Sequence, residues 1–510
     1  MTSGVQAEII TFLSDPASLA QGPVEQIETH GSIVFLTGDR AYKLKKAVRF
    51  SYLDYSTLPL REAACRRELT LNARFAPSLY LAVMPITRER DGSLALDGGG
   101  DPVDWLVVMR RFPQADQLDR VAEQGLLTPP LLRALADQIA TAHDLALPDF
   151  TFGGPDAFQR IHAATLKDLL SYAGQDLDPV AVAQWGKAAA AALSGLAPML
   201  EQRRRGGHVR AAHGDLHLAN ICLIDQVPTL FDAIEFDPAL STIDLLYDLA
   251  FLLMDLESRG LRDAANLVFN RYLDLRDESD GLEALPFFMS LRAAIRAQVL
   301  FAATLNASDS REHATKRGQS KSYLRLALDL LRPAPPRLIA IGGFSGTGKS
   351  TLAQALAPRV GTAPGARVLR SDVLRKRVFG VTPETRLPPE GYSADAHLRT
   401  YTALYAQARQ CLQAGRSVIA DAVFGGVEER DAIRATADAV DAPFDAVWLT
   451  APLSALEQRV TARVGDASDA TVSVVHHQIS RTQAVPDWQR IDAGQGVDLT
   501  LASVIGVLDV

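Results

Sequence analysis

Cysteine is rare in this sequence of 510 residues, which holds only three: Cys65, Cys222 and Cys411. Because they lie far apart and are odd in number, a disulfide framework is not expected, and no Cys-x-x-Cys pair offers a metal site. Basic residues are also in deficit, with 52 against 60 acidic ones and a net charge of −8. This balance argues against a protein that coats nucleic acid or another polyanion, although it is compatible with a local basic site.

Long hydrophobic runs are missing as well. No uncharged apolar run approaches the roughly 20 residues that cross a bilayer, and the best one, at 245–254, is interrupted by Asp248. Residues 1–20 lack the basic-then-apolar order of a signal peptide. Since 47% of the residues are hydrophobic and 22% charged, neither disorder nor collagen nor a coiled coil is expected. We therefore expect a soluble, cytoplasmic protein with no membrane partner.

The length predicts several domains, because a single core seldom exceeds roughly 300 residues. The clearest boundary is residues 331–336, Leu-Arg-Pro-Ala-Pro-Pro, since three prolines cannot continue a helix and favour an extended linker. Residues 337–510 have the size of one α/β domain and open with an apolar strand that ends in glycines. Residues 1–330 divide into a strand-rich small lobe at about 20–112 and a helical lobe at about 113–330.

Hydrophobic spacing predicts the main elements of the first 330 residues. We expect strands at 32–37, 41–48, 82–86 and 106–109, a helix at 60–74 between them, and helices at 129–146, 178–200, 244–257 and 285–305. One polar, strand-bearing stretch, 208–237, interrupts the helices. This is a two-lobe pattern, which composition alone does not establish.

A glycine-rich motif follows the strand that opens the C-terminal domain. It reads Gly-Phe-Ser-Gly-Thr-Gly-Lys-Ser and fits G-x-x-x-x-G-K-[ST] at every fixed position, between an apolar strand and a helical run. Glycines let backbone N–H groups surround phosphates, and the helix adds its positive N-terminal dipole. Lys349 would reach the β- and γ-phosphates, and Ser350 would ligate Mg²⁺. The residues expected to bind nucleotide here are Gly343, Phe344, Ser345, Gly346, Thr347, Gly348, Lys349, Ser350 and Thr351.

Charged residues downstream refine this site. Asp372 follows a second strand and would be the catalytic base that takes a proton from an acceptor hydroxyl, unless it is only a helix N-cap. The D-x-x-R pair that it forms with Arg375 suits contact with a substrate that accepts phosphate, rather than strand separation of nucleic acid. Asp421 ends an apolar strand, the position that usually handles Mg²⁺ or its water. Arg459 and Arg463 lie four residues apart on an expected helix and could close over the nucleotide phosphate, or could be surface charges.

These residues resemble the P-loop kinase group that includes gluconate kinase, the zeta toxins, chloramphenicol phosphotransferase and polynucleotide 5′-kinase. The resemblance covers about residues 337–500. It implies an AAA-type ATP-binding domain with a parallel sheet flanked by helices, and phosphoryl transfer from ATP or GTP to a hydroxyl of a small molecule or nucleotide. It also places Asp372 in the position of the base.

A second candidate site lies in the polar stretch 208–237. The spacing H-x-D-x-x-x-x-N at His213, Asp215 and Asn220 places a carboxylate and an amide on one catalytic loop. The Asp215 carboxylate would receive the proton of an acceptor hydroxyl, and the Asn220 amide would ligate a metal ion. Asp232 follows an apolar strand and would make the second metal contact, because charge on a transferring phosphoryl group needs neutralising from more than one side.

This stretch resembles the aminoglycoside phosphotransferase and choline kinase branch of the protein-kinase-like fold. The resemblance implies a lysine that binds ATP and a glutamate that pairs with it. Lys43 is the preferred lysine, although Lys45 points to the same face of the strand, and Glu68 is the preferred partner unless it is a surface residue. Asp248 matches the acid that braces the catalytic loop. No G-x-G-x-x-G loop covers the phosphates, since only His-Gly-Ser at 30–32 stands there.

The whole sequence thus predicts a multidomain α+β and α/β protein, with a bilobal protein-kinase-like domain at 1–330 and a P-loop domain at 337–510. We expect an ATP-dependent phosphotransferase with two nucleotide sites, which uses Mg²⁺ and ATP or GTP and acts on hydroxyl groups of small-molecule metabolites. One alternative is a single kinase whose P-loop domain is an ATP-binding regulator. Another is a toxin-like kinase of nucleotide sugars or nucleic-acid ends, but the net acidity and the lack of an aromatic–basic stripe disfavour nucleic acid.

Overall fold

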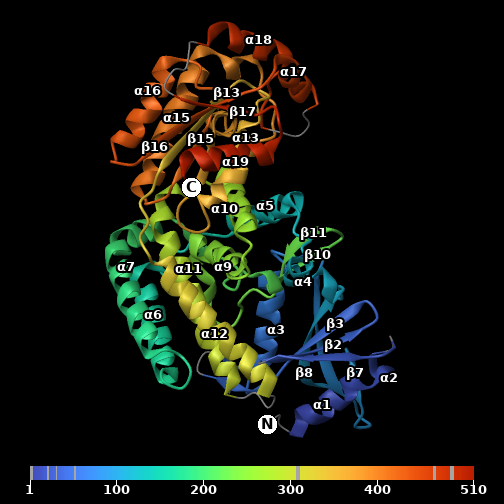
Figure 1. The fold of residues 1–510 in the computed structure, drawn as a ribbon. Helices are drawn as coiled ribbons and strands as arrows, with labels where there is room; N and C mark the ends of the chain where they lie inside the picture. Colours follow the sequence, from blue (N-terminus) through green and yellow to red (C-terminus); the bar gives the residue numbers. More distant parts are fainter. Residues whose placement is uncertain are drawn as a thin grey trace. The chain divides into compact units, whose positions relative to one another are not determined.

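The computed structural model describes residues 4–19, 22–29, 31–50, 53–305, 310–462, 467–482 and 488–509 (Figure 1). The chain forms two compact units: Met1–Ala157 with Glu201–Leu252, and Phe158–Leu200 with Leu253–Val510. The helical region expected at 113–330 is therefore divided between the units, and the proline segment 331–336 lies inside the second one.

The first unit is built on an antiparallel sheet with the order β1-β2-β3-β8-β6-β7 (Figure 1). The bounds are β1 Glu25–Glu28, β2 Ser32–Thr37, β3 Arg40–Lys45, β6 Tyr80–Arg88, β7 Leu94–Leu96 and β8 Asp101–Arg110, with the short pair β4 Arg49–Phe50 and β5 Leu53–Asp54 beside it. Four of these strands match the expected ones, but β3 ends at Lys45 and not at 48. The strand β1 was not expected, because its Glu-Gln-Ile-Glu sequence is an exposed polar edge without hydrophobic alternation.

Helices cover both faces of this sheet. Ile9 of α1, Gly4–Ser14, packs into a core with Phe35 and Leu44, while Cys65 of α3, Leu58–Asn72, packs on the opposite face. The short helix α2 spans Pro16–Leu19. Because side chains alternate along a strand, the residues of β3 on either side of Leu44 point toward α3. This alternation directs two lysines, Lys43 and Lys45, at one helix.

The rest of the first unit holds the polar stretch 208–237 between helices. The hairpin of β10 and β11 carries the end of the catalytic loop, and β9 pairs with β12 at its start. The bounds are β9 Val209–Ala211, β10 Ile221–Ile224, β11 Val227–Leu230, β12 Thr242–Asp244, α4 Leu118–Glu123, α5 Pro129–Leu145, α8 Pro238–Ser241 and α9 Leu245–Ser258.

The second unit combines long helices with a parallel sheet. The helices are α6 Gly154–Tyr172, α7 Pro179–Arg205, α10 Arg262–Leu275, α11 Leu285–Thr304 and α12 Ser310–Leu330. Among the described residues, the stretch Ser279–Thr304 alone has the length and hydropathy of a membrane span, and 67% of its apolar 18-residue window is buried by the protein itself. A core helix of a folded domain has the same properties.

The parallel sheet has the order β14-β15-β13-β16-β17, as expected for a P-loop domain (Figure 1). The strands are β13 Leu338–Gly343, β14 Arg367–Arg370, β15 Val418–Asp421, β16 Phe444–Thr450 and β17 Gln489–Asp492. The helices are α13 Lys349–Leu356, α14 Ser371–Val378, α15 Ala394–Gln413, α16 Val427–Asp438, α17 Leu453–Thr461, α18 Val472–Arg481 and α19 Val497–Leu508. Since all strands run the same way, their carboxyl ends meet at one edge, where the P-loop and Asp421 lie.

Helix α10 covers the open side of β14, the edge strand of this sheet. The Asn270 side chain accepts the Val368 N–H at 2.8 Å, and Arg367 forms an ion pair with Asp274 at 2.7 Å. The first contact satisfies a backbone group that an edge strand would otherwise expose, and the second adds an ion pair between side chains. They give a physical reason why residues after 253 fall in the same unit as the P-loop domain and are not separated from it at the prolines.

Candidate active sites

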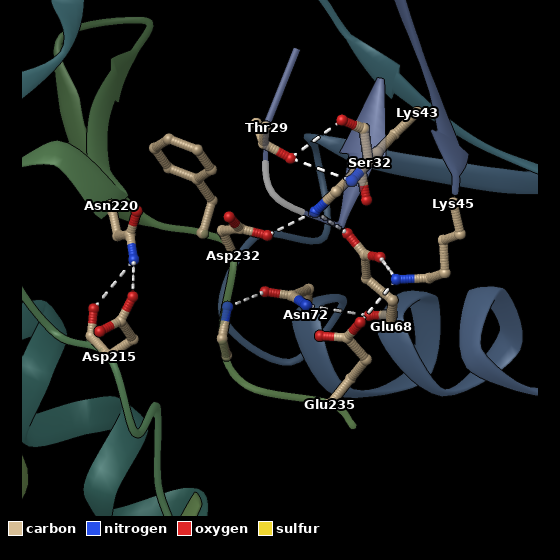
Figure 2. Close-up of polar contacts among 12 residues, drawn as sticks. Thr29, Ser32, Lys43, Lys45, Glu68, Asn72, Asp215, Asn220, Asp232 and Glu235 are labelled. Atoms are coloured by element: carbon tan, nitrogen blue, oxygen red, sulfur yellow. Dashed lines mark hydrogen bonds and ion pairs between the residues drawn. The ribbon is translucent and has the colours of Figure 1, made fainter. Parts of the chain in front are cut away.

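Lys43 joins two carboxylates in the first unit (Figure 2). Its Nζ lies 2.8 Å from Glu68 Oε1 on α3 and 2.6 Å from Asp232 Oδ1, which follows β11. Burial alone would lower the pKa of Lys43, but Asp232 and Glu68 outweigh it and raise that pKa well above its usual value. Lys43 is therefore a firmly charged ammonium group, and Glu68 is a buried partner and not a surface residue.

Lys45 differs from Lys43 in its surroundings. Its side chain is 1% exposed and its Nζ lies 2.6 Å from Glu68 Oε2, on the side away from Asp232 (Figure 2). Lys43 is 13% exposed and contacts Asp232, which is 44% exposed. Of the two lysines that sequence alone does not separate, Lys43 is the one that faces the accessible carboxylate.

The catalytic loop places Asp215 beside Asn220. The Asn220 Nδ2 donates to Asp215 Oδ2 at 2.8 Å and to the Asp215 carbonyl at 3.0 Å (Figure 2). Because its nitrogen is engaged, the amide oxygen of Asn220 is the atom that would meet a cation. The loop is braced by Asp248, which accepts the N–H groups of His213 and Gly214 at 3.1 and 2.8 Å.

His213 holds the loop together from inside. Its ring is 1% exposed, and its Nε2 donates to the Phe231 carbonyl at 2.9 Å. Burial lowers its pKa, so the ring is neutral near pH 7. The motif predicts a catalytic role for His213; in the structure its buried ring is hydrogen-bonded to the carbonyl of Phe231, the residue before Asp232.

The backbone of Asp232 is held in a left-handed conformation, with φ at 61°. Its N–H donates to the Tyr80 hydroxyl at 3.1 Å. The next N–H, of Ala233, donates to Asn72 Oδ1 at 2.8 Å (Figure 2). A non-glycine residue costs about 1–2 kcal/mol in this conformation, so the surrounding contacts must hold it there.

The P-loop of the second unit has the conformation that its glycines permit. Gly343, Gly346 and Gly348 have φ values of 140°, 88° and 93°, a region that L side chains avoid. At the carboxyl edge of the sheet, Ser350 Oγ donates to Asp421 Oδ2 at 2.5 Å. Two oxygen atoms this close, one of them anionic, suit the hard cation Mg²⁺, so these residues fit the metal ion that the motif implies.

A cavity of about 990 Å³ unites the predicted residues of this site. Lys349, Ser350, Asp372, Arg375 and Asp421 all line it. Asp372 lies in the first turn of α14, whose N-cap is residue 370, so Asp372 is not an N-cap but faces the cavity. Arg375 is 8% exposed, and its side chain stacks on the Tyr392 ring at 5.2 Å.

Of Arg459 and Arg463, the two arginines that were expected to close over the nucleotide phosphate, the structure describes only the first. Arg459 donates to the carbonyls of Gly346 and Ala493 at 3.4 and 3.0 Å, so it supports the P-loop from outside the cavity lining. Arg463 lies outside the described residues. A different residue reaches the P-loop: Gln478 of α18 accepts the Ser345 N–H at 2.9 Å.

Sequence reasoning missed several residues of both sites. Glu235, Tyr55, Tyr80 and Asn72 contact the Lys43–Asp232 region, and Gln478 contacts the P-loop. Only Glu235 has a local signal: it is an acid between Ile and Phe, three residues after Asp232, where a solvated charge is unusual. The others are brought in by the tertiary fold and belong to no motif.

The C-terminal domain has a recognised family relationship. Residues 338–485 match the AAA domain family. Together with the geometry of the P-loop and of the Lys43 site, this match supports a phosphotransferase that binds a nucleotide.

Among solved structures, a choline/ethanolamine kinase family protein from Mesorhizobium loti is 15% identical, covering 64% of this chain and 99% of that chain with a TM-score of 0.41. A gluconokinase from Sinorhizobium meliloti 1021 is 20% identical, covering 35% of this chain and 94% of that chain with a TM-score of 0.26.

Proteins that resemble the whole chain come from mycobacteria. Uncharacterized protein Rv2004c of Mycobacterium tuberculosis and uncharacterized protein Mb2027c of Mycobacterium bovis are each 30% identical over 478 residues. The alignment covers 92% of this chain and 91% of each relative. The chain therefore belongs to the same family as these two mycobacterial proteins.

Proposed function

We propose that the protein is an ATP-dependent phosphotransferase with two nucleotide sites, which phosphorylates hydroxyl groups of small-molecule metabolites. The observation that carries the proposal is a second set of phosphate-handling residues in addition to the P-loop. Lys43 bridges Glu68 and Asp232 in the first unit, whose catalytic loop pairs Asp215 with Asn220. The two sets lie in different units of the chain, which supports two separate nucleotide sites.

In the first unit, Lys43 binds the phosphates of ATP, while Glu68 keeps its ammonium group in place. Asp215 accepts the proton of the acceptor hydroxyl as the oxygen attacks the γ-phosphorus. Asn220 and Asp232 would hold Mg²⁺, which neutralises charge on the phosphoryl group when bound. Asp215 is 38% exposed, so an acceptor can approach it.

In the second unit, backbone N–H groups of the P-loop and Lys349 bind the nucleotide phosphates. Ser350 and Asp421 would hold Mg²⁺. Asp372 accepts the proton of the second acceptor hydroxyl, and Arg375 contacts that acceptor from one turn further along α14. The shared cavity supports these roles, because both groups line it together with Lys349.

A regulatory role of the P-loop domain is the second candidate. It is favoured by α10, whose Asn270 accepts a backbone N–H of β14, the strand that leads to Asp372. A nucleotide-dependent shift of β14 would therefore reach α10 directly. In this case the P-loop domain binds ATP and alters the rate of the first site without transferring phosphate.

Two single variants decide between the candidates when labelled ATP is incubated with a pooled metabolite extract. We expect Asp215→Asn and Lys349→Ala each to abolish the labelling of a different product, with losses of about 100-fold or more. If Lys349→Ala instead changes only the rate of the Asp215-dependent product, the P-loop domain is a regulator. Unchanged labelling by both variants would contradict a phosphotransferase of either kind.

A further inference from the structure

A second ion-pair set lies behind the Lys43 site. Besides Glu68, the Lys45 Nζ contacts Glu235 Oε1 at 2.5 Å (Figure 2). It also lies 3.3 Å from the Tyr55 hydroxyl. The Tyr55 hydroxyl also donates to Glu235 Oε1 at 2.7 Å, and the Lys45 ammonium lies 4.8 Å from the centre of the Tyr55 ring. Three side chains from β3, the residue after β5, and the segment after β11 therefore meet in one cluster.

The two carboxylates of this segment face different surroundings. Asp232 is 44% exposed, whereas Glu235, three residues later, is 7% exposed and reaches back to Lys45. A buried glutamate in contact with a buried ammonium group is satisfied by protein, so it is not available to the accessible site. The burial of Glu235 and its ion pair with Lys45 therefore argue against a role for Glu235 as an additional ligand of the metal ion.

The segment 232–235 needs an anchor because Asp232 has a positive φ. The Tyr80 hydroxyl and the Asn72 side chain hold its first two N–H groups, but both contacts lie at the start of the segment. Asn72 is the last residue of α3, so its contact with Ala233 ties this segment to the helix, and its amide also donates to the Glu68 carbonyl at 3.0 Å within the same helix. The Glu235 carboxylate supplies the only side-chain ion pair described at the far end of the segment.

We propose that Lys45, Glu235 and Tyr55 are positioning residues, which fix the segment 232–235 so that the Asp232 carboxylate is presented to the metal ion of the first site. Lys45 does not contact the nucleotide in this arrangement, although it lies two residues from Lys43 on the same face of β3. The inference rests on the proposed function of the first unit, because it assigns Asp232 to a metal ion.

The test compares nucleotide binding with and without the metal ion in the full chain. All variants carry Lys349→Ala, which silences the P-loop site, and calorimetry measures the Kd of a non-hydrolysable ATP analogue in the absence of metal and at saturating Mg²⁺. Lys43→Met is expected to weaken metal-free binding by about 10-fold, because it removes a charge-assisted bond to phosphate. Lys45→Met is expected to leave metal-free binding unchanged but to reduce the tightening by Mg²⁺ about 10-fold.

Further variants separate positioning from a loss of folding. Glu235→Gln keeps the size of the side chain and should reproduce the Lys45→Met effect, and the double variant should lose no more than the larger single one, since the pair acts as a unit. Lys45→Arg restores the charge and should recover part of the Mg²⁺ response. Arg88→Met removes an ion pair with Glu8 at the surface of the same sheet and should leave both affinities unchanged.

Each contrary outcome has its own meaning. If Lys45→Met weakens metal-free binding as Lys43→Met does, Lys45 is a nucleotide ligand and the inference is wrong. Equal Mg²⁺ tightening in all Lys45 and Glu235 variants would also overturn it, as would additive losses in the double variant. If the Lys349→Ala protein binds no ATP analogue at all, the first unit has no nucleotide site, and the proposed function fails together with this inference.

Discussion

The two candidate sites assemble their phosphate-binding residues in opposite ways. In the P-loop domain, the residues from Gly343 to Ser350 are consecutive, and the conformation of the backbone makes the site. In the first unit, Lys43 meets Glu68 from 25 residues away and Asp232 from 189 residues away. One site is thus a local structure, and the other exists only when three distant segments are packed together.

This difference has consequences for charge. The first site pairs two largely buried lysines with the carboxylates of Glu68, Asp232 and Glu235, and Glu68 is the partner that both lysines share. In the second site, Lys349 Nζ donates to the Phe344 carbonyl at 3.1 Å, within its own loop. We therefore expect the removal of a charged side chain to destabilise the fold of the first site. In the second site, the addition of a side chain to a glycine should disturb the backbone of the P-loop.

The largest expected effect is on Glu68. Glu68→Ala leaves two buried ammonium groups without their shared partner, which should lower the free energy of unfolding of the first unit by about 3–5 kcal/mol. Hydrogen exchange of peptides from α3 measures this locally, without interference from the second unit. Glu28→Ala is the matched control, because Glu28 is 65% exposed in its pair with Lys46 and should change stability by less than about 1 kcal/mol.

The ion pairs of Glu68 with Lys43 and Lys45 also determine how the stability of the first unit depends on pH. Burial alone would raise the pKa of Glu68, but Lys43 and Lys45 outweigh it and hold that pKa below its usual value of 4.5. The ion pairs thus contribute stability that is present above pH 4.5 and is lost as the pH falls toward the folded-state value. A Glu68→Ala protein whose α3 exchanges like the wild type at pH 7 would contradict the assembly of the site from buried charges.

How far the sequence predicts each site follows from this contrast. The P-loop and the catalytic loop are short consecutive patterns, so Lys349, Ser350, Asp215 and Asn220 are found directly. The sequence does not decide between Lys43 and Lys45, because a strand puts both side chains on one face. Only the packing of α3 and the segment 232–235 separates them.

Other features depend on tertiary contacts from the start. Gln478 reaches the P-loop across the fold and belongs to no motif, and the partner of Glu235 lies 190 residues away along the chain. The exposed polar strand β1 shows no hydrophobic alternation. Likewise, the prolines at 331–336 predict a chain break, but the hydrogen bonds of Asn270 to β14 are made by residues with no periodic signal. Motifs of consecutive residues can be recognised in the sequence, whereas the pairing of polar groups that lie far apart along the chain cannot.

An intermediate effect is expected in the P-loop itself. A Cβ on Gly346 would lie 2.8 Å from the Leu456 carbonyl oxygen, whereas a Cβ on Gly348 would meet no atom within 4 Å. Both positions have positive φ, so alanine costs about 1–2 kcal/mol in each, and Gly348→Ala should weaken ATP binding about 10-fold. Gly346→Ala adds overpacking of about 1–3 kcal/mol and should weaken binding about 100-fold.

These affinities are measured by calorimetry in an Asp215→Asn background. Hydrogen exchange of the first unit should be the same in both glycine variants, since neither touches it. Equal losses for the two alanines would show that backbone conformation alone, without the contact to α17, determines the phosphate site.

The smallest expected effect is that of Asp421→Asn, which should change the free energy of unfolding in the opposite direction to Glu68→Ala. Burial raises the pKa of Asp421 above its usual value of 3.8, against the opposing effects of Lys349 and Arg370. The folded state therefore holds the proton of Asp421 more tightly than the unfolded state does. This stabilises the fold below pH 3.8, and the stabilisation is lost as the pH rises through the pKa of the folded state. Without Mg²⁺ at pH 7, Asp421→Asn should thus raise the free energy of unfolding.

Hydrogen exchange of β15 measures this change, and Asp438→Asn, at an exposed position of α16 in the same domain, should leave it unaltered. Adding Mg²⁺ with ATP should then stabilise the wild-type domain and not the Asp421→Asn domain, because we propose this carboxylate as the charged ligand of the metal ion. A lower stability of Asp421→Asn in the absence of metal would mean that Lys349 and Arg370 hold this carboxylate as Lys43 and Lys45 hold Glu68. Both sites would then be networks of buried charge, and only their spacing along the sequence would differ.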